Sequence, residues 1–287
     1  MSLLIGGLAL GSIYALIALG VVMVFRATGI VNFAQSELLM IGAYAYYLAS
    51  GFTDSPVIQI AIALGAGALG GVVCFLVTHF LLRGAPEIVL IIGTLALLVF
   101  AQSGARLLFT DNPRRVEGWI FESADVSLLG STVALNSILA FVVSVLAAVA
   151  LLVWLGSTKV GHSVQAAAED TWRAALTGVH VTRTLALSWI IGGALAAIGG
   201  VFLSPVTGVY PTMGGDIIFS VFVVVAIGGF RSLWGALVGG LLVGLLQTFS
   251  VVVIGGAFRD IVMFTILLAV LLWRPSGLFR SAAARTV

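Results

Sequence analysis

Residues Met1–Phe25 read MSLLIGGLALGSIYALIALGVVMVF, a run of 25 residues that contains no charged side chain. A bilayer core about 30 Å thick requires roughly 20 apolar residues in a helix. The run is therefore long enough to cross a membrane, and Arg26 follows it directly. It lacks the basic segment that begins a secretory signal. The stretch predicts a first membrane helix that is retained in the mature protein.

The rest of the chain has the same character. Of its 287 residues, 61% are hydrophobic and only 8% are charged, whereas soluble domains carry about a quarter charged residues. The apolar runs leave room for about eight or nine spanning helices and for no soluble domain of useful size. We therefore expect an all-α, polytopic helical membrane protein with one transmembrane domain over residues 1–287.

Composition also excludes several classes of function. The formal net charge of +2 is too small to indicate a nucleic-acid partner. Cys74 is the single cysteine, so neither an intrachain disulfide nor a cysteine-based metal cluster can form, and no metal site is expected. No HExxH motif is present. Gln102-Ser103 resembles an intramembrane serine site only faintly, because no activating motif accompanies it, and no catalytic residue is assigned.

The apolar runs predict the membrane spans. They are expected at about 2–25, up to about 49, 57–82, 88–108, 132–155, 184–203, 217–227, 233–254 and up to 273. The run at 217–227 is short enough to be a half-helix or a re-entrant segment. Two long polar stretches interrupt the series, one at 110–131 and one at 156–183.

Lysine and arginine in short loops predict the orientation, because such loops stay in the cytoplasm. Arg26, Arg83, the 156–183 stretch, Arg231 and the tail from Arg274 fall on one side if nine segments cross the membrane. That arrangement places the N-terminus outside and the C-terminus in the cytoplasm. Arg114 and Arg115 oppose it, but acidic residues offset them within a long loop.

The stretch at 156–183 reads GSTKVGHSVQAAAEDTWRAALTGVHVTR. Apolar residues recur at three- to four-residue steps over Val164–Leu176, which predicts a short amphipathic helix of about four turns. Ser163 is expected to cap its start, and Gly178 to end it in the left-handed conformation. Between long apolar runs, such a helix suits a lever between the membrane body and a partner outside it. The alternative is an ordinary solvated loop.

Polar residues that interrupt the apolar sequence are the candidates for a translocation path. Around the second span they are Asn32, Gln35 and Glu37, with Phe33 between them. Gln102 and Asp216 join them from other spans, Asp216 beside a pair of glycines. The alternative for each is an ordinary interhelical or interfacial hydrogen bond. Because the carboxylates and Arg106 fall near span ends, the pattern disfavours a proton-coupled carrier.

Several stretches resemble one family, the branched-chain amino acid ABC transporter permeases of the LivH type. In chain order they are GSIYALIALG at 11–20, VNFAQSELLMIGAY at 31–44, AAED at 167–170 with alanines 174–175 and Gly178-Val179, GGALAAIGGV at 192–201, GG at 228–229 with GALVGG at 235–240, and RPSGLF at 274–279. Each motif is weak alone, but together they are specific and cover nearly the whole chain.

The resemblance implies a permease subunit of an importer in a bacterial inner membrane. Its implied partners are a second, LivM-like permease, two cytosolic LivG/LivF-like ATPases, a periplasmic substrate-binding protein and membrane lipid. ATP would be bound by the ATPases, so this chain has no cofactor of its own. The 156–183 stretch is similar to the coupling loop of the family, and its candidate contact residues are Ala168, Glu169, Asp170, Trp172, Arg173 and Gly178.

Two questions stay open at this level. The chain departs from the resemblance at Gln35-Ser36, where many members have His-Gly, and sister systems import urea, short amides and other small acids. The resemblance therefore does not fix the substrate. The alternative from another functional class is a stand-alone secondary transporter or channel for a small polar solute.

Overall fold

The computed structural model describes residues 2–116, 125–128, 131–274 and 277. The tail beyond these residues, including part of the RPSGLF stretch, lies outside the described part. The helices are α1 (Ser2–Thr28), α2 (Gln35–Ser50), α3 (Pro56–Leu76) with the π-helical turn η1 (Val77–Leu81), α4 (Glu87–Phe109), α5 (Leu135–Ser157), α6 (Lys159–Glu169), α7 (Thr171–Leu176), α8 (Val181–Thr207), α9 (Gly215–Gly228), α10 (Leu233–Val253), the 3-10 turn η2 (Gly256–Phe258) and α11 (Arg259–Trp273).

Seven helices in the described residues are long and apolar enough to cross a membrane. They are α1, α3 continued by η1, α4, α5, α8, α10, and α11 with the turn before it. The other two apolar segments form shorter helices, since α2 has 16 residues and α9 has 14. The number of full-length helices is therefore smaller than the eight or nine spans that the sequence predicts.

Helix α1 lies at the centre of the bundle, and its side chains from Ser12 to Val24 are buried. It packs against α10, α8, α5 and α9. Glycines allow the closest of these contacts: Gly244 of α10 lies directly against the backbone of Gly11, so that a methyl group at either position would clash. Such small residues are what let membrane helices approach one another.

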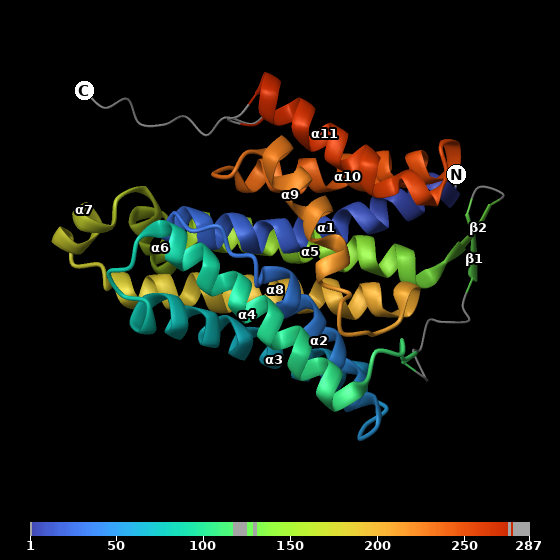
Figure 1. Cartoon of the computed structure of the whole chain (residues 1–287), viewed down its shortest axis with the longest axis horizontal. Coiled ribbons are helices and arrows are strands. Elements are labelled where there is room, and N and C mark those ends of the chain that lie inside the picture. Colours follow the sequence, from blue (N-terminus) through green and yellow to red (C-terminus); the bar gives the residue numbers. More distant parts are fainter. Residues whose placement is uncertain (1, 117–124, 129–130, 275–276, 278–287) are drawn as a thin grey trace.

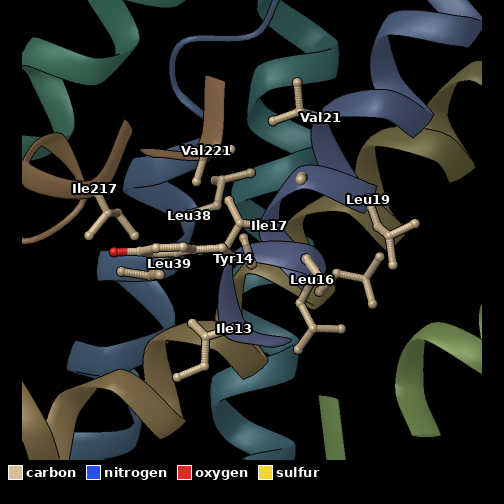
Figure 2. Close-up of a cluster of buried hydrophobic side chains, with 14 of the residues drawn as sticks. Ile13, Tyr14, Leu16, Ile17, Leu19, Val21, Leu38, Leu39, Ile217 and Val221 are labelled. Atoms are coloured by element: carbon tan, nitrogen blue, oxygen red, sulfur yellow. The ribbon is translucent and has the colours of Figure 1, made fainter. Parts of the chain in front are cut away.

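The apolar core joins α1 to the two short helices. Figure 2 shows Tyr14 and Ile17 of α1 among Leu38 and Leu39 of α2, with Ile217 and Val221 of α9 beside them. All six of these side chains except that of Tyr14 are aliphatic, so dispersion and close packing hold this region together. The core thus fixes where α2 and α9 begin relative to α1.

One strand lies in the polar stretch at 110–131 and a second begins at its end, where no strand was expected. β1 (Asp125–Leu128) pairs with β2 (Ser131–Ala134) in antiparallel register, with Val126 opposite Val133. Valine and threonine, which are β-branched, are favoured in the strands of such a ribbon. Upstream of it, the N–H of Arg114 donates to the carbonyl of Val209 at 2.9 Å, and the reverse bond is 2.8 Å. These bonds tie the stretch to the loop after α8.

The bundle has two distinct ends (Figure 1). Helices α6 and α7 lie at one end, while the start of the chain and the β1–β2 hairpin lie at the other. The C-terminal end of α1 belongs to the α6–α7 end, because Arg26 and Gln165 of α6 line the same pocket. The turn between α9 and α10 is there too, since Phe230 packs against Phe25 with ring centroids 5.2 Å apart.

Candidate functional site

Helix α2 begins inside the bundle, not at its surface. Its first residue, Gln35, lies against Gly20 of α1 and Gly192 of α8. Gly20 is eight residues before the end of α1 at Thr28, a distance of about 12 Å along a helix at 1.5 Å per residue. The non-helical segment 29–34 therefore leads from the α6–α7 end back into the interior, where α2 starts.

Helix α9 begins at the same place. Gly214, the residue before it, lies directly against the carbonyl of Ser36, and no larger residue fits there without displacement. A methyl group on Gly215 would lie 3.0 Å from the Gln102 amide. The N-terminal ends of α2 and α9 thus meet inside the bundle, beside α4. We call this meeting point, made by Ser36, Glu37, Gln102, Gly214 and Gly215, the junction.

Asn32 and Gln35 hold the start of α2 in place. Both side chains are buried, at 1% and 2% exposure. The Asn32 amide donates to Gln35 Oε1 at 3.2 Å, and Gln35 Nε2 donates to the carbonyl of Gly192 at 2.7 Å. The N–H of Ala34 donates to Asn32 Oδ1 at 3.1 Å. Because each amide is engaged by the protein itself, these bonds hold the start of α2 in position.

Phe33, between these amides, links α2 to two other helices. Its ring packs edge-on against Phe222 of α9, with centroids 5.0 Å apart. Its backbone N–H donates to the Thr94 hydroxyl of α4 at 3.3 Å. Since its partners lie on α4 and α9, Phe33 helps to fix the walls of the junction.

Glu37 is the charged group of the junction, and it is 1% exposed. Gln102 Nε2 donates to its Oε1 at 2.9 Å. Among the described residues, no hydrogen-bond donor reaches its Oε2, which is buried. A buried carboxylate oxygen without a donor is costly, because the loss of water is not compensated. The free oxygen is therefore an acceptor that a bound donor could satisfy.

An apolar pocket of about 470 Å³ opens beside Glu37 between α2, α3 and α4. Its walls include Ile41, Val73, Leu97 and Phe100, and Glu37 alone of the described lining residues carries a charge. The arrangement combines a carboxylate with a large aliphatic surface. It is chemically suited to a molecule with both a cationic group and an apolar group.

Asp216 lies next to the junction but faces away from it. Its carboxylate is exposed, and the Tyr210 hydroxyl donates to its Oδ2 at 2.8 Å. Arg259 donates to the Asp216 carbonyl at 3.2 Å. Asp216 thus belongs to a second pocket, of about 380 Å³, with Arg259 and Asp260.

The polar stretch at 156–183 forms two helices, so the single helix expected over Val164–Leu176 is wrong. The chain breaks at Asp170, which is extended, with φ −157° and ψ 107°. Its Oδ1 accepts from the N–H groups of Trp172 and Arg173, each at 2.9 Å, and so caps α7. An aspartate at this position satisfies N–H groups that a continuous helix would have bonded internally.

The expectation that Ser163 caps the first helix is also wrong. Thr158 caps α6, because its hydroxyl accepts from the N–H of Gly161 at 2.9 Å. The hydroxyl of Ser163 instead donates to the carbonyl of Lys159 inside the helix at 3.0 Å. The capping threonine precedes the apolar periodicity by six residues, which is why the pattern alone placed the start too late.

The expected end of this region is confirmed. Gly178 has φ +85°, in the left-handed region. Its N–H donates to the carbonyl of Ala175, and the N–H of Val179 donates to that of Ala174, both at 3.1 Å. This pair of bonds is the Schellman arrangement that ends a helix and turns the chain. It sets the direction in which the chain leaves α7 and enters α8.

The candidate contact residues of this region divide between two faces. Ala168 lies toward α1 in a small pocket with Val164, and Glu169 is exposed at the end of α6. Trp172 and Leu176 of α7 are 71% and 69% exposed. Arg173 pairs with Asp170 at 3.2 Å on the surface. An exposed tryptophan and leucine on one short helix form a surface that another protein can cover.

The sequence comparisons agree on one family. The family described as "Branched-chain amino acid transport system / permease component" matches residues 3–271. This chain belongs to that family. It is a family of transport permeases, not of enzymes.

The permease is similar along almost its whole length to several named proteins. It is 32% identical to "High-affinity branched-chain amino acid transport system permease protein BraD" of Pseudomonas aeruginosa, over 96% of this chain and 94% of that protein. It is 30% identical to the corresponding LivH of Salmonella typhimurium, over 95% and 92%. A "Probable branched-chain amino acid transport permease protein LivH" of Methanocaldococcus jannaschii is 30% identical, over 95% and 90%. No solved structure matches the chain.

The permease fold brings some sequence candidates together and separates others. Glu37 and Gln102, 65 positions apart, are hydrogen-bonded, and Asn32, Phe33 and Gln35 lie beside them. Asp216 faces the neighbouring pocket. Thr94 and Gly192 were missed. A threonine in an apolar run carries no signal, and the role of Gly192 is played by its carbonyl, which any residue has.

Proposed function

We propose that this permease is a membrane subunit of an ABC importer that carries branched-chain amino acids inward. The relatives are named for branched-chain amino acid transport. The observation that carries the proposal is the junction, where a buried carboxylate with one free oxygen borders an aliphatic pocket. A binding protein on the outer face delivers the substrate.

The chemistry of the junction fits a zwitterion with an aliphatic side chain. The free Oε2 of Glu37 accepts from the substrate's ammonium group. The N-terminal ends of α2 and α9 carry partial positive charge and favour the carboxylate, as half-helices do in other transporters. The wall of Ile41, Val73 and Leu97 accommodates the branched side chain. A neutral amide or urea offers neither the charge pair nor the apolar surface.

The departure from the family pattern at Gln35-Ser36 bears on helix position more than on substrate. Gln35 Nε2 is engaged by the Gly192 carbonyl, and the Ser36 hydroxyl donates to the Phe33 carbonyl at 3.3 Å. Both side chains thus bond within the protein. The proposal accordingly keeps a branched-chain amino acid as the substrate in spite of this departure.

The proposed assembly contains four further subunits. A second, LivM-like permease completes the pathway, two LivG/LivF-like ATPases bind ATP, and a periplasmic protein binds the substrate. This chain contributes no cofactor. The exposed Trp172 and Leu176 of α7 support a seat for one ATPase, because an apolar helix face can fill a groove on a partner. The complex lies in a bacterial inner membrane.

In the proposed topology, nine segments cross the membrane, with the N-terminus outside. Seven are the full-length helices. The remaining two are each a short helix plus the non-helical segment that leads to it: 29–34 with α2, and 208–214 with α9. Support comes from the arginines at the α6–α7 end and from the opposite placement of the chain's start (Figure 1). Positive charge in short loops marks the cytoplasmic side.

Labelling of single cysteines tests this orientation. With Cys74 replaced by alanine, Ser55→Cys is expected to react with a membrane-impermeant maleimide from the outside of intact cells. Glu87→Cys, exposed at the start of α4, is expected to react only after the cells are opened. Glu87 carries no positive charge, so its replacement leaves the orienting residues unchanged. The reverse labelling pattern would refute the topology.

Uptake in a host that lacks its own branched-chain amino acid importers tests the function. Co-expression of this chain with the neighbouring transport genes is expected to restore accumulation of labelled leucine. Unlabelled isoleucine and valine should compete, while urea and acetamide at the same concentration should not. We also expect uptake to be lost when a substitution in an ATPase subunit abolishes ATP hydrolysis. Uptake by this chain alone would favour the stand-alone carrier.

A further inference from the structure

A pocket at the α6–α7 end combines positive charge with an apolar floor. It has a volume of about 490 Å³ and lies between α1, α5, α6 and α10. Its polar side holds Arg26, Arg231 and Gln165. Its apolar side is formed by residues of α5 and of the start of α10. They are Val149, Leu152, Val153, Leu155, Leu233 and Trp234. The pocket is separate from the junction.

Neither arginine has a directly paired carboxylate among the described residues. In the part of the chain that the structure describes, Arg26 and Arg231 form no ion pair, and Arg26 is half-buried. Burial disfavours the charge of Arg26, Glu169 of α6 attracts it from beyond ion-pair distance, and Arg231 repels it more weakly. Two guanidinium groups in a partly buried pocket lose hydration, and a carboxylate beyond ion-pair distance replaces it only in part. An anion between them would remove the repulsion and replace lost water.

The backbone adds to the attraction. Ser232, Leu233 and Trp234, which line the pocket, form the cap and first turn of α10. The N-terminal end of this 21-residue helix carries partial positive charge, and a phosphate is the group that such an end favours. Three independent sources of positive potential therefore meet at one point.

The apolar side of the pocket extends along α5 far enough to contact the acyl chain of a lipid as well as its headgroup. Val149 lies eight residues before the end of α5 at Ser157, about 12 Å along the helix axis. Val149 and Val153 are 40% and 59% exposed, so they present a continuous apolar surface from the charged end toward the bilayer centre. Trp234 is 61% exposed, as tryptophans at the membrane interface are.

We propose that this pocket binds an anionic glycerophospholipid, with its phosphate between Arg26 and Arg231 and an acyl chain along α5. The lipid would join the end of α1 to α6, the helix that leads into α7, and so hold the cytoplasmic elements against the membrane body. The proposal does not depend on which substrate is carried. It predicts a preference for phosphatidylglycerol over phosphatidylcholine of the same acyl chains.

Native mass spectrometry of the purified transporter with each added lipid tests the proposal. The Arg26→Gln/Arg231→Gln variant is expected to bind phosphatidylglycerol roughly thirtyfold more weakly, since each basic residue near an anionic headgroup contributes about a fivefold factor. Arg231→Gln alone, at an exposed position, should show about a fivefold loss. Arg83→Gln is the matched control, because Arg83 is exposed in the η1–α4 turn and does not line the pocket.

A second variant separates a lipid from a free anion. Val153→Trp fills the apolar floor and leaves both arginines, so it should weaken phosphatidylglycerol binding while inorganic phosphate binding stays unchanged. Displacement of the lipid by millimolar phosphate, with no effect of Val153→Trp, would show an anion site instead. Equal phosphatidylglycerol binding by the parental protein and the double arginine variant would overturn the proposal. So would loss of the lipid when the other subunits assemble, because a partner would then cover the pocket.

Discussion

Replacing Glu37 with leucine is expected to lower leucine uptake by a factor between about ten and a hundred, which is what one hydrogen bond to a charged group supplies. The change removes the oxygen that accepts from the substrate and leaves the Gln102 amide without its partner. The protein should still reach the membrane in normal amounts. A leucine in place of a buried, half-satisfied carboxylate costs no desolvation of charge.

A second substitution at the same position separates charge from shape. Glu37→Gln keeps an oxygen that accepts from Gln102, but it removes the negative charge. If Glu37 attracts an ammonium group, this variant should transport nearly as poorly as Glu37→Leu. Glu87→Gln, an exposed carboxylate in the first turn of α4, is the control and should transport at the parental rate. Parental uptake by Glu37→Gln would remove Glu37 from the substrate path.

The bounds of the long helices could be predicted from the sequence, because the length of each apolar run determines them. The expected spans at 57–82 and 233–254 lie within a few residues of α3 with η1 and of α10. The suggestion that 217–227 forms a half-helix agrees with the 14-residue α9. The same method could not place α2 at depth. A polar segment before an apolar run has the same sequence pattern whether it lies at the surface or folds back against Gly20.

The candidate site was only partly predictable, because its geometry depends on contacts between distant segments. The sequence marks Glu37 and Gln102 separately, as polar residues in apolar surroundings, and their pairing follows from the packing of α4 near α2. Local chemistry misled in the 156–183 stretch. There the apolar period continues across Asp170, but the aspartate bonds to the next N–H groups and divides the helix. Periodicity does not register this competition between side chain and backbone.

Replacing Gly178 with valine is expected to uncouple ATP hydrolysis from transport. A methyl group at Gly178 would meet no atom within 4 Å, so the effect comes from the backbone alone. An L-residue in the left-handed region costs about 1–2 kcal/mol, and a β-branched residue is disfavoured most. Relief of that strain would open the turn after α7 and redirect Trp172. Leucine uptake should fall roughly fivefold to thirtyfold, the factor that corresponds to this strain.

Two further variants distinguish a backbone effect from a general one. Gly178→Asn should recover much of the uptake, because asparagine tolerates a positive φ better than other residues. Gly65→Val is the matched control, since Gly65 also has open space around it but lies in the regular helix α3. The readout is ATP hydrolysis by the reconstituted importer, with and without the loaded binding protein, beside uptake. In Gly178→Val the basal hydrolysis should persist while its stimulation by the binding protein is lost. Copurification of the ATPases with full stimulation and parental uptake would show that α7 is not the coupling element.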